Sequence, residues 1–263
     1  MYQRENTRQV RIGRLKLGGS KHVVIQSMAS IKTSRVEEVS KQINRCAVLG
    51  AELMRVSVLD EKDAKAIREI RKRITIPLVA DIHIDYRLAL DAIESGVEAI
   101  RINPGNIGTE DKIKAVIDAC KEKNIPIRIG VNSGSLDRSI YHGSESIRAE
   151  YLFESAKKHV EICEALGFQD IVVSLKGSNL LETIKAYELA SEYFPYPLHI
   201  GITEAGPKDI GLIRSAAGLS PLLLSGIGDT IRISLSDEPE EEVKAASRLL
   251  HDLGLKRDYP TFI

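Results

Sequence analysis

Eight short runs rich in β-branched residues recur along the 263-residue chain, and each is followed by a longer amphipathic segment. This alternation is typical of repeated strand-helix units, which build parallel sheets. The runs cover residues 22–28, 52–58, 76–83, 97–103, 125–132, 170–176, 197–203 and 230–236. No stretch rich in Pro, Gly or Ser is long enough to separate two domains. The pattern therefore favours an α/β fold, a closed (β/α)8 TIM barrel, over a doubly wound sheet.

The segments around the first run carry further signals. Residues 8–19 (RQVRIGRLKLGG) predict a β-hairpin with Gly13 at its turn. We expect residues 1–21 to form an N-terminal hairpin cap and residues 22–263 to form the barrel. Ser34 and Glu37 predict a capping box at the start of the first helix. A long polar connection at residues 133–147 is of the kind that often forms a lid.

Overall charge and cysteine content limit the partners and the compartment. Lys+Arg and Asp+Glu each number 37, which excludes attraction of nucleic acid or an anionic membrane by bulk charge. Apolar runs stay far below the roughly 18 residues that span a bilayer. Cys46, Cys120 and Cys163 are isolated, and the N-terminus lacks a signal-peptide pattern. We therefore expect a cytoplasmic protein that binds neither nucleic acid nor membrane.

Cations occur inside the predicted strands, between apolar residues. Side chains alternate across a strand, so a charged residue between two β-branched ones faces the barrel interior. The predicted inward cations are Arg55, Arg101, Arg128, Lys176 and Arg232. Toward the strand ends the same register places Met28, Asn103, Asn132, Thr203 and Ser234. These carboxyl ends form the barrel face on which active sites are built.

Inward carboxylates are fewer than inward cations. Asp81 and Glu204 face five cations, which leaves a surplus of three positive charges. Such a surplus favours a ligand with several negative charges, and Arg, Lys, Asn and Ser suit phosphate oxygens. The absence of Trp argues against a nucleic-acid groove. His83 shares a face with Asp81, but the spacing is weak for a metal site, and Asp85 is expected to cap the next helix.

The strand-end motifs, taken in order, are similar to those of one enzyme family. They are VIQSM, MRVSV, ADIHID, IRINPGN, IRIGVNSGS, SLKGSN, GITEAG and GIGDTIRISLS. They resemble the N-terminal barrel domain of 4-hydroxy-3-methylbut-2-enyl diphosphate synthase, an iron-sulfur oxidoreductase of the non-mevalonate isoprenoid pathway. The resemblance covers essentially the whole chain. It implies two-electron reductive dehydration and ring opening of 2-C-methyl-D-erythritol 2,4-cyclodiphosphate to 4-hydroxy-3-methylbut-2-enyl diphosphate.

The resemblance also implies roles for individual residues. The positions that match substrate-binding residues of the family are Arg55, Arg101, Asn103, Arg128, Asn132, Lys176, Arg232, Ser234, Met28, Thr203 and His83. The two positions that match catalytic residues are Glu204, a proton-transfer candidate, and Asp81, an orienting carboxylate. The family further implies a homodimer in its full-length form and reduced ferredoxin or flavodoxin as electron donor.

One departure from the family is large. Its members continue into a second domain in which three cysteines and one glutamate hold a [4Fe-4S] cluster. This chain ends at Ile263, where the first Cys-x-x-Cys of that domain is expected, and its own three cysteines lack the spacing to replace it. We therefore expect a substrate-binding barrel that holds no cluster and is inactive alone. Two alternatives are a pterin-binding transferase similar to dihydropteroate synthase and a non-enzymatic barrel that binds a phosphometabolite.

Overall fold

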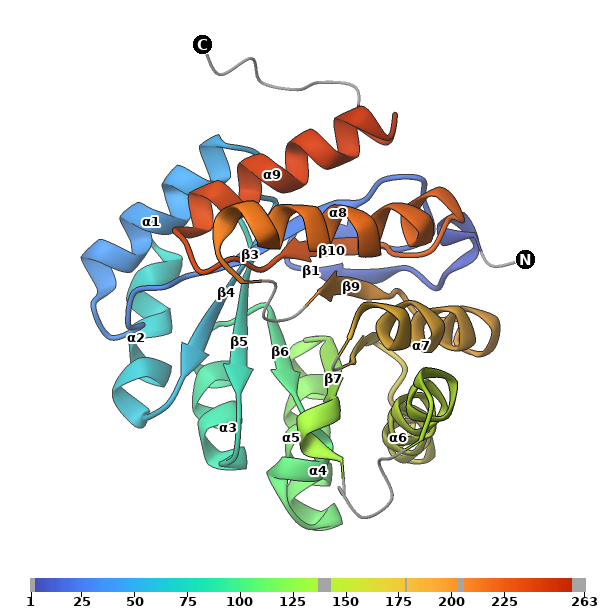
Figure 1. Cartoon of the computed structure of the whole chain (residues 1–263). Helices are drawn as coiled ribbons and strands as arrows, with labels where there is room; N and C mark the ends of the chain where they lie inside the picture. Colours follow the sequence, from blue (N-terminus) through green and yellow to red (C-terminus); the bar gives the residue numbers. More distant parts are fainter. Residues whose placement is uncertain (1–2, 137–142, 178, 203–205, 257–263) are drawn as a thin grey trace.

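Eight parallel strands form a barrel in the computed structural model, which describes residues 3–136, 143–177, 179–202 and 206–256 (Figure 1). They are β3 (Val24–Met28), β4 (Leu53–Val58), β5 (Leu78–Ile82), β6 (Ala99–Ile102), β7 (Ile127–Asn132), β8 (Ile171–Lys176), β9 (His199–Ile202) and β10 (Thr230–Ile233). Their order is β8-β7-β6-β5-β4-β3-β10-β9. The barrel closes between β8 and β9, where the Val173 N–H donates to the Pro197 carbonyl at 2.9 Å. The predicted (β/α)8 TIM barrel is confirmed, and a doubly wound sheet is excluded.

Helices surround the strands on the outside of the barrel (Figure 1). They are α1 (Val36–Val48), α2 (Glu61–Arg71), α3 (Tyr86–Glu94), α4 (Pro104–Ile107), α5 (Glu110–Lys123), α6 (Glu145–Ala165), α7 (Leu180–Tyr193), α8 (Lys208–Leu224) and α9 (Pro239–Asp252). Two short 3-10 helices cover Arg4–Asn6 and Ser133–Ser135. Part of the connection predicted as a lid, residues 137–142, lies outside the described residues.

The start of α1 differs from its prediction. Ser34 and Glu37 form no capping box, because the helix begins at Val36 and Arg35 occupies the cap position without a side-chain hydrogen bond. The Ser34 N–H donates instead to Asp63 Oδ1 of α2, at 2.8 Å. A contact between the segment before α1 and the side chain of Asp63 on α2 therefore overrides the local signal.

The cap of α3 is confirmed. Asp85 precedes the helix in extended backbone, and its carboxylate accepts the Arg87 N–H at 3.0 Å. Such a bond satisfies one of the free N–H groups at a helix start. Asp85 is thereby engaged in local structure rather than in the barrel mouth.

Two separate apolar clusters show which way the strand residues face. The larger cluster joins strand residues such as Ile100, Ile127 and Ile231 to the surrounding helices. The smaller cluster lies inside the barrel and contains Val24, Leu53, Val79, Ala99 and Val172. The isoleucines that flank the strand arginines belong to the outer cluster, so alternation turns the arginines inward.

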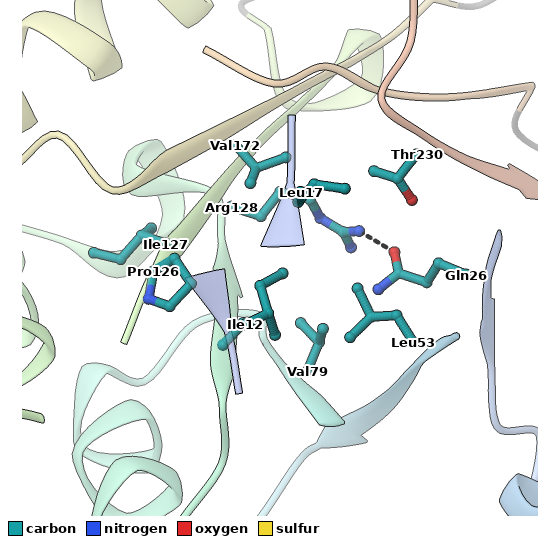
Figure 2. Close-up of a pocket in the computed structure, with 11 residues that line it drawn as sticks. Ile12, Leu17, Gln26, Leu53, Val79, Pro126, Ile127, Arg128, Val172 and Thr230 are labelled. Carbon is teal, nitrogen blue, oxygen red and sulfur yellow. Dashed lines mark hydrogen bonds between the residues drawn. The ribbon is translucent and has the colours of Figure 1, made fainter. Parts of the chain in front are cut away.

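A hairpin closes the N-terminal end of the barrel. Strands β1 (Val10–Ile12) and β2 (Leu15–Leu17) pair antiparallel, and Gly13 takes φ +56° at their turn. Ile12 and Leu17 reach the interior beneath the strands (Figure 2). They join the smaller apolar cluster and leave a cavity of only about 10 Å³. This apolar floor leaves the opposite end of the barrel for polar chemistry.

Candidate functional site

Charged residues line the inner faces of the strands above the floor. Arg55 on β4 and Arg101 on β6 flank Asp81 on the intervening β5. Asp81 Oδ2 lies 3.4 Å from Arg55 Nε, and its Oδ1 accepts from Arg101 Nη1 at 3.2 Å. All three side chains are buried. One carboxylate thus holds two guanidinium groups of the predicted set.

The protonation states of this trio follow from burial and charge. Burial opposes ionisation of Asp81, but Arg55, Arg101 and Arg128 outweigh it and lower the pKa of that carboxyl to about 2. Burial lowers the pKa of Arg55 to about 10, a shift that Asp81 partly opposes. Asp81 is therefore ionised and Arg55 is charged at neutral pH.

Arg128 on β7 has a neutral partner. Its Nη1 donates to Gln26 Oε1 on β3 (Figure 2). Within the described residues Arg128 makes no other hydrogen bond or ion pair, and its buried Nε is unpartnered. Burial, and then the charges of Arg55 and Arg101, lower the pKa of Arg128 well below its ordinary value. This guanidinium carries a charge that no described carboxylate touches.

Arg232 on β10 pairs with a carboxylate that was not predicted. Its Nε and Nη2 donate to the two oxygens of Glu242 on α9, at 3.1 and 3.0 Å. Glu242 is buried and also accepts from the Ser27 hydroxyl at 2.7 Å and from the Leu235 N–H at 3.0 Å. Strand alternation could not find Glu242, because it lies on a helix. Its position four residues before Ala246, on the buried face of α9, was the available signal.

Lys176 ends β8 beside Asn132, its register partner on β7. Both side chains are half-buried. Lys176 makes no ion pair with any residue that the structure describes. Burial lowers the pKa of its amine, and Arg55, Arg232 and Arg128 lower it further.

The remaining predicted residues lie around this cluster. Met28 Sδ accepts from Arg55 Nη2 at 2.7 Å and lies 3.7 Å from Arg232 Nη1. Asn103, just past the end of β6, is buried, and Ser234, just past the end of β10, is half-buried. The His83 side chain is 48% exposed, and its Nε2 lies 3.8 Å from Asp81 Oδ2. Thr203 and Glu204 lie outside the described residues.

The described part of the cluster contains more cations than carboxylates. Arg55 and Arg101 share Asp81, Arg232 pairs with Glu242, and the two remaining cations have no carboxylate among the residues described. The surplus among these residues is three positive charges. Of the two carboxylates in the cluster, Asp81 was expected from the sequence and Glu242 was not. A partly desolvated cluster of this kind is stabilised by an anion that brings several charges.

The cysteines do not fit an iron-sulfur cluster. Cys46, Cys120 and Cys163 are buried singly on α1, α5 and α6. Burial raises the pKa of all three thiols, to about 12 for Cys46 and Cys163, whereas cluster ligands are thiolates. Across the described residues, no three His, Cys, Asp or Glu side chains come together as a metal site. We therefore assign no step to a metal group held by these residues.

Fold and site together define a class, a TIM barrel whose mouth suits a multiply charged anion. The chain belongs to the GcpE family, whose TIM-barrel domain model matches residues 7–247. This confirms the family resemblance found in the motifs.

Curated relatives of this family match nearly the whole chain. The 4-hydroxy-3-methylbut-2-en-1-yl diphosphate synthase (flavodoxin) of Lysinibacillus sphaericus (strain C3-41) is 53% identical over 260 residues, which are 99% of this chain and 70% of the relative. The synthase of the same name from Caldanaerobacter subterraneus subsp. tengcongensis is 52% identical over 255 residues, 97% of this chain and 72% of the relative.

Solved structures with low sequence identity share the fold. Dihydropteroate synthase from Stenotrophomonas maltophilia has a TM-score of 0.70 at 12% identity and covers 96% of this chain and 99% of its own. Type I 3-dehydroquinate dehydratase from Clostridium difficile has a TM-score of 0.64 at 14% identity, with 94% and 98% coverage. These likenesses show a TIM barrel alone and give the pterin-binding alternative no further support. Among the described helices, none has the length and hydrophobicity needed to cross a membrane.

Proposed function

We infer that this chain is the substrate-binding barrel of an oxidoreductase, a 4-hydroxy-3-methylbut-2-enyl diphosphate synthase. The substrate is 2-C-methyl-D-erythritol 2,4-cyclodiphosphate, and two electrons and two protons convert it to the linear diphosphate and one water. The observation that carries the proposal is the surplus of three positive charges among the described residues at the mouth of a barrel from this family. A cyclic diphosphate supplies negative charge on both phosphates in one compact group.

The diphosphate binds, in this proposal, to the cations of the mouth. Arginine forks donate paired hydrogen bonds to phosphate oxygens, and Lys176 acts as a point charge. The charged binding residues are Arg55, Arg101, Arg128, Lys176 and Arg232. The neutral donors are Asn103, Asn132 and Ser234. By resemblance to the family, Met28 and Thr203 are assigned to the pocket wall, and His83 contributes from the rim.

Asp81 and Glu204 have different roles. Asp81 touches Arg55 and Arg101, and its pKa of about 2 keeps it ionised at neutral pH. A carboxylate in this state orients cations and does not donate a proton. Glu204, just past the end of β9, is the residue that we propose for proton transfer at the reacting carbon and hydroxyl.

The electrons come from outside the barrel. We propose reduced flavodoxin as donor, because both relatives described above carry flavodoxin in their names, with ferredoxin as the second choice. The [4Fe-4S] cluster of the family would supply one-electron transfer from residues other than the three buried cysteines. A homodimer and a cytoplasmic location complete the proposal, since buried free thiols suit a reducing compartment.

Calorimetric titration of the chain with the cyclodiphosphate tests the proposal. We expect one molecule to bind per barrel, with an affinity that falls as salt rises. A pterin diphosphate is the control ligand, and we expect it not to bind. Binding of the pterin without the cyclodiphosphate would overturn the assignment in favour of a transferase. After anaerobic iron-sulfur reconstitution of this chain we expect no turnover. A stoichiometric cluster with turnover would contradict the inference that its three buried cysteines hold no cluster.

A further inference from the structure

Gln26 is a buried polar residue to which the proposed function gives no role. Its side chain points into the barrel from β3 and is 2% exposed (Figure 2). In the inward register it lies between Val24 of the apolar floor and Met28 of the mouth. Its Oε1 accepts from Arg128 Nη1, and its Nε2 is buried without a partner in the described part of the chain. Among the described residues, the amide therefore makes its one hydrogen bond through its oxygen, to Arg128.

Arg128 differs from the other arginines of the mouth in the charge of its partner. Arg55 and Arg101 contact Asp81, and Arg232 contacts Glu242. A carboxylate fixes a guanidinium and also compensates its charge. An amide oxygen holds the guanidinium by accepting a hydrogen bond and leaves its positive charge uncompensated.

We propose that Gln26 is a positioning residue of the anion site, which orients Arg128 while leaving its positive charge for a phosphate of the ligand. The inference rests on the proposed function, because it requires a diphosphate in this mouth. A carboxylate at position 26 keeps the acceptor and compensates one positive charge of the surplus counted among the described residues. Since Gln26 Nε2 has no described partner, the change from amide to carboxylate breaks no described hydrogen bond.

The experiment compares Gln26→Glu and Gln26→Met with the unchanged chain, using inorganic pyrophosphate in calorimetry and thermal unfolding by circular dichroism. We expect Gln26→Glu to weaken pyrophosphate binding at least about tenfold through loss of one charge-assisted contact. The same variant should melt at an equal or higher temperature, because its carboxylate relieves repulsion among the cations. Gln26→Met has a similar volume and no acceptor, and should weaken binding by about three- to tenfold.

Gln9→Glu is the matched control for net charge. Gln9 is exposed and precedes β1, at the opposite end of the barrel, so this variant should bind pyrophosphate as the unchanged chain does. A purely structural role for Gln26 would shift the melting temperature and leave affinity alone. Wild-type affinity in Gln26→Glu overturns the proposal. If that variant does not fold, wild-type affinity in Gln26→Met overturns it equally. If the unchanged chain binds neither pyrophosphate nor the cyclodiphosphate, the proposed function itself is refuted.

Discussion

Lys176 and Arg232 both belong to the cation cluster, but they differ in pairing. Lys176 contacts no carboxylate within the described residues, whereas Arg232 donates two hydrogen bonds to the buried Glu242. Replacing each by Met removes one positive charge and keeps an unbranched apolar stem. We expect Lys176→Met to lose more anion affinity and Arg232→Met to lose more stability.

The magnitudes follow from these contacts. Lys176→Met removes one charge-assisted contact with phosphate, about 1.5 to 3 kcal/mol, or about 10- to 150-fold in affinity. It leaves no buried charge behind, so the free energy of unfolding should stay constant or rise. Arg232→Met leaves Glu242, which is 3% exposed, without its guanidinium. Breaking a buried pair in this way costs about 3 to 5 kcal/mol, and the Ser27 and Leu235 hydrogen bonds favour the lower end.

Pyrophosphate titration by calorimetry measures the affinities, and urea unfolding monitored by circular dichroism measures the stabilities. The double variant Arg232→Met with Glu242→Gln is the control, because it removes the orphaned carboxylate and should recover much of the lost stability. The reasoning is refuted if Lys176→Met binds pyrophosphate as tightly as the unchanged chain. It is refuted equally if Arg232→Met unfolds at the wild-type urea concentration.

Two further predictions concern Asp81 and the hairpin. The pKa of Asp81 is lowered to about 2 in the folded chain, so its contribution to stability is complete above pH about 4 and is lost as pH falls toward 2, about 2 kcal/mol in all. Urea unfolding across this range should show a slope that Asp81→Asn flattens, and an unchanged slope in that variant would contradict the assignment. Leu17→Ala should reduce the free energy of unfolding by about 2 to 5 kcal/mol, because Leu17 is 1% exposed in the barrel floor. Its pyrophosphate affinity should stay at the wild-type value, and a parallel loss of affinity would show that floor and mouth are coupled.

Strand alternation was the most informative part of the sequence. The Ile-Arg-Ile triplets place both isoleucines against the helices, so the arginine has one direction left, and the structure shows Arg101 and Arg128 inside the barrel. This inference needs only the two-residue period of a strand. Features with so short a period are local, and the sequence predicts them well.

Partners brought together by tertiary packing were less accessible to prediction. Glu242 follows two other glutamates in the first turn of α9, where acidic residues are common, and its pairing with Arg232 depends on how that helix packs against β3 and β10. The capping box at Ser34 failed for a related reason, since Asp63 of the next helix holds the Ser34 N–H. The two-residue period of β3 turns Gln26 inward together with Met28, but only the fold brings it to Arg128, 102 residues away in the chain.

The hairpin beneath the strands also decides how molecules enter and leave. Ile12 and Leu17 fill the N-terminal end and leave a cavity of about 10 Å³, too small for any diphosphate to cross. In the proposed binding mode, substrate and product must then use the same opening, above the same cations. A product that keeps both phosphates therefore blocks the next substrate until it departs, so product inhibition should be competitive and turnover is tied to the rate of release.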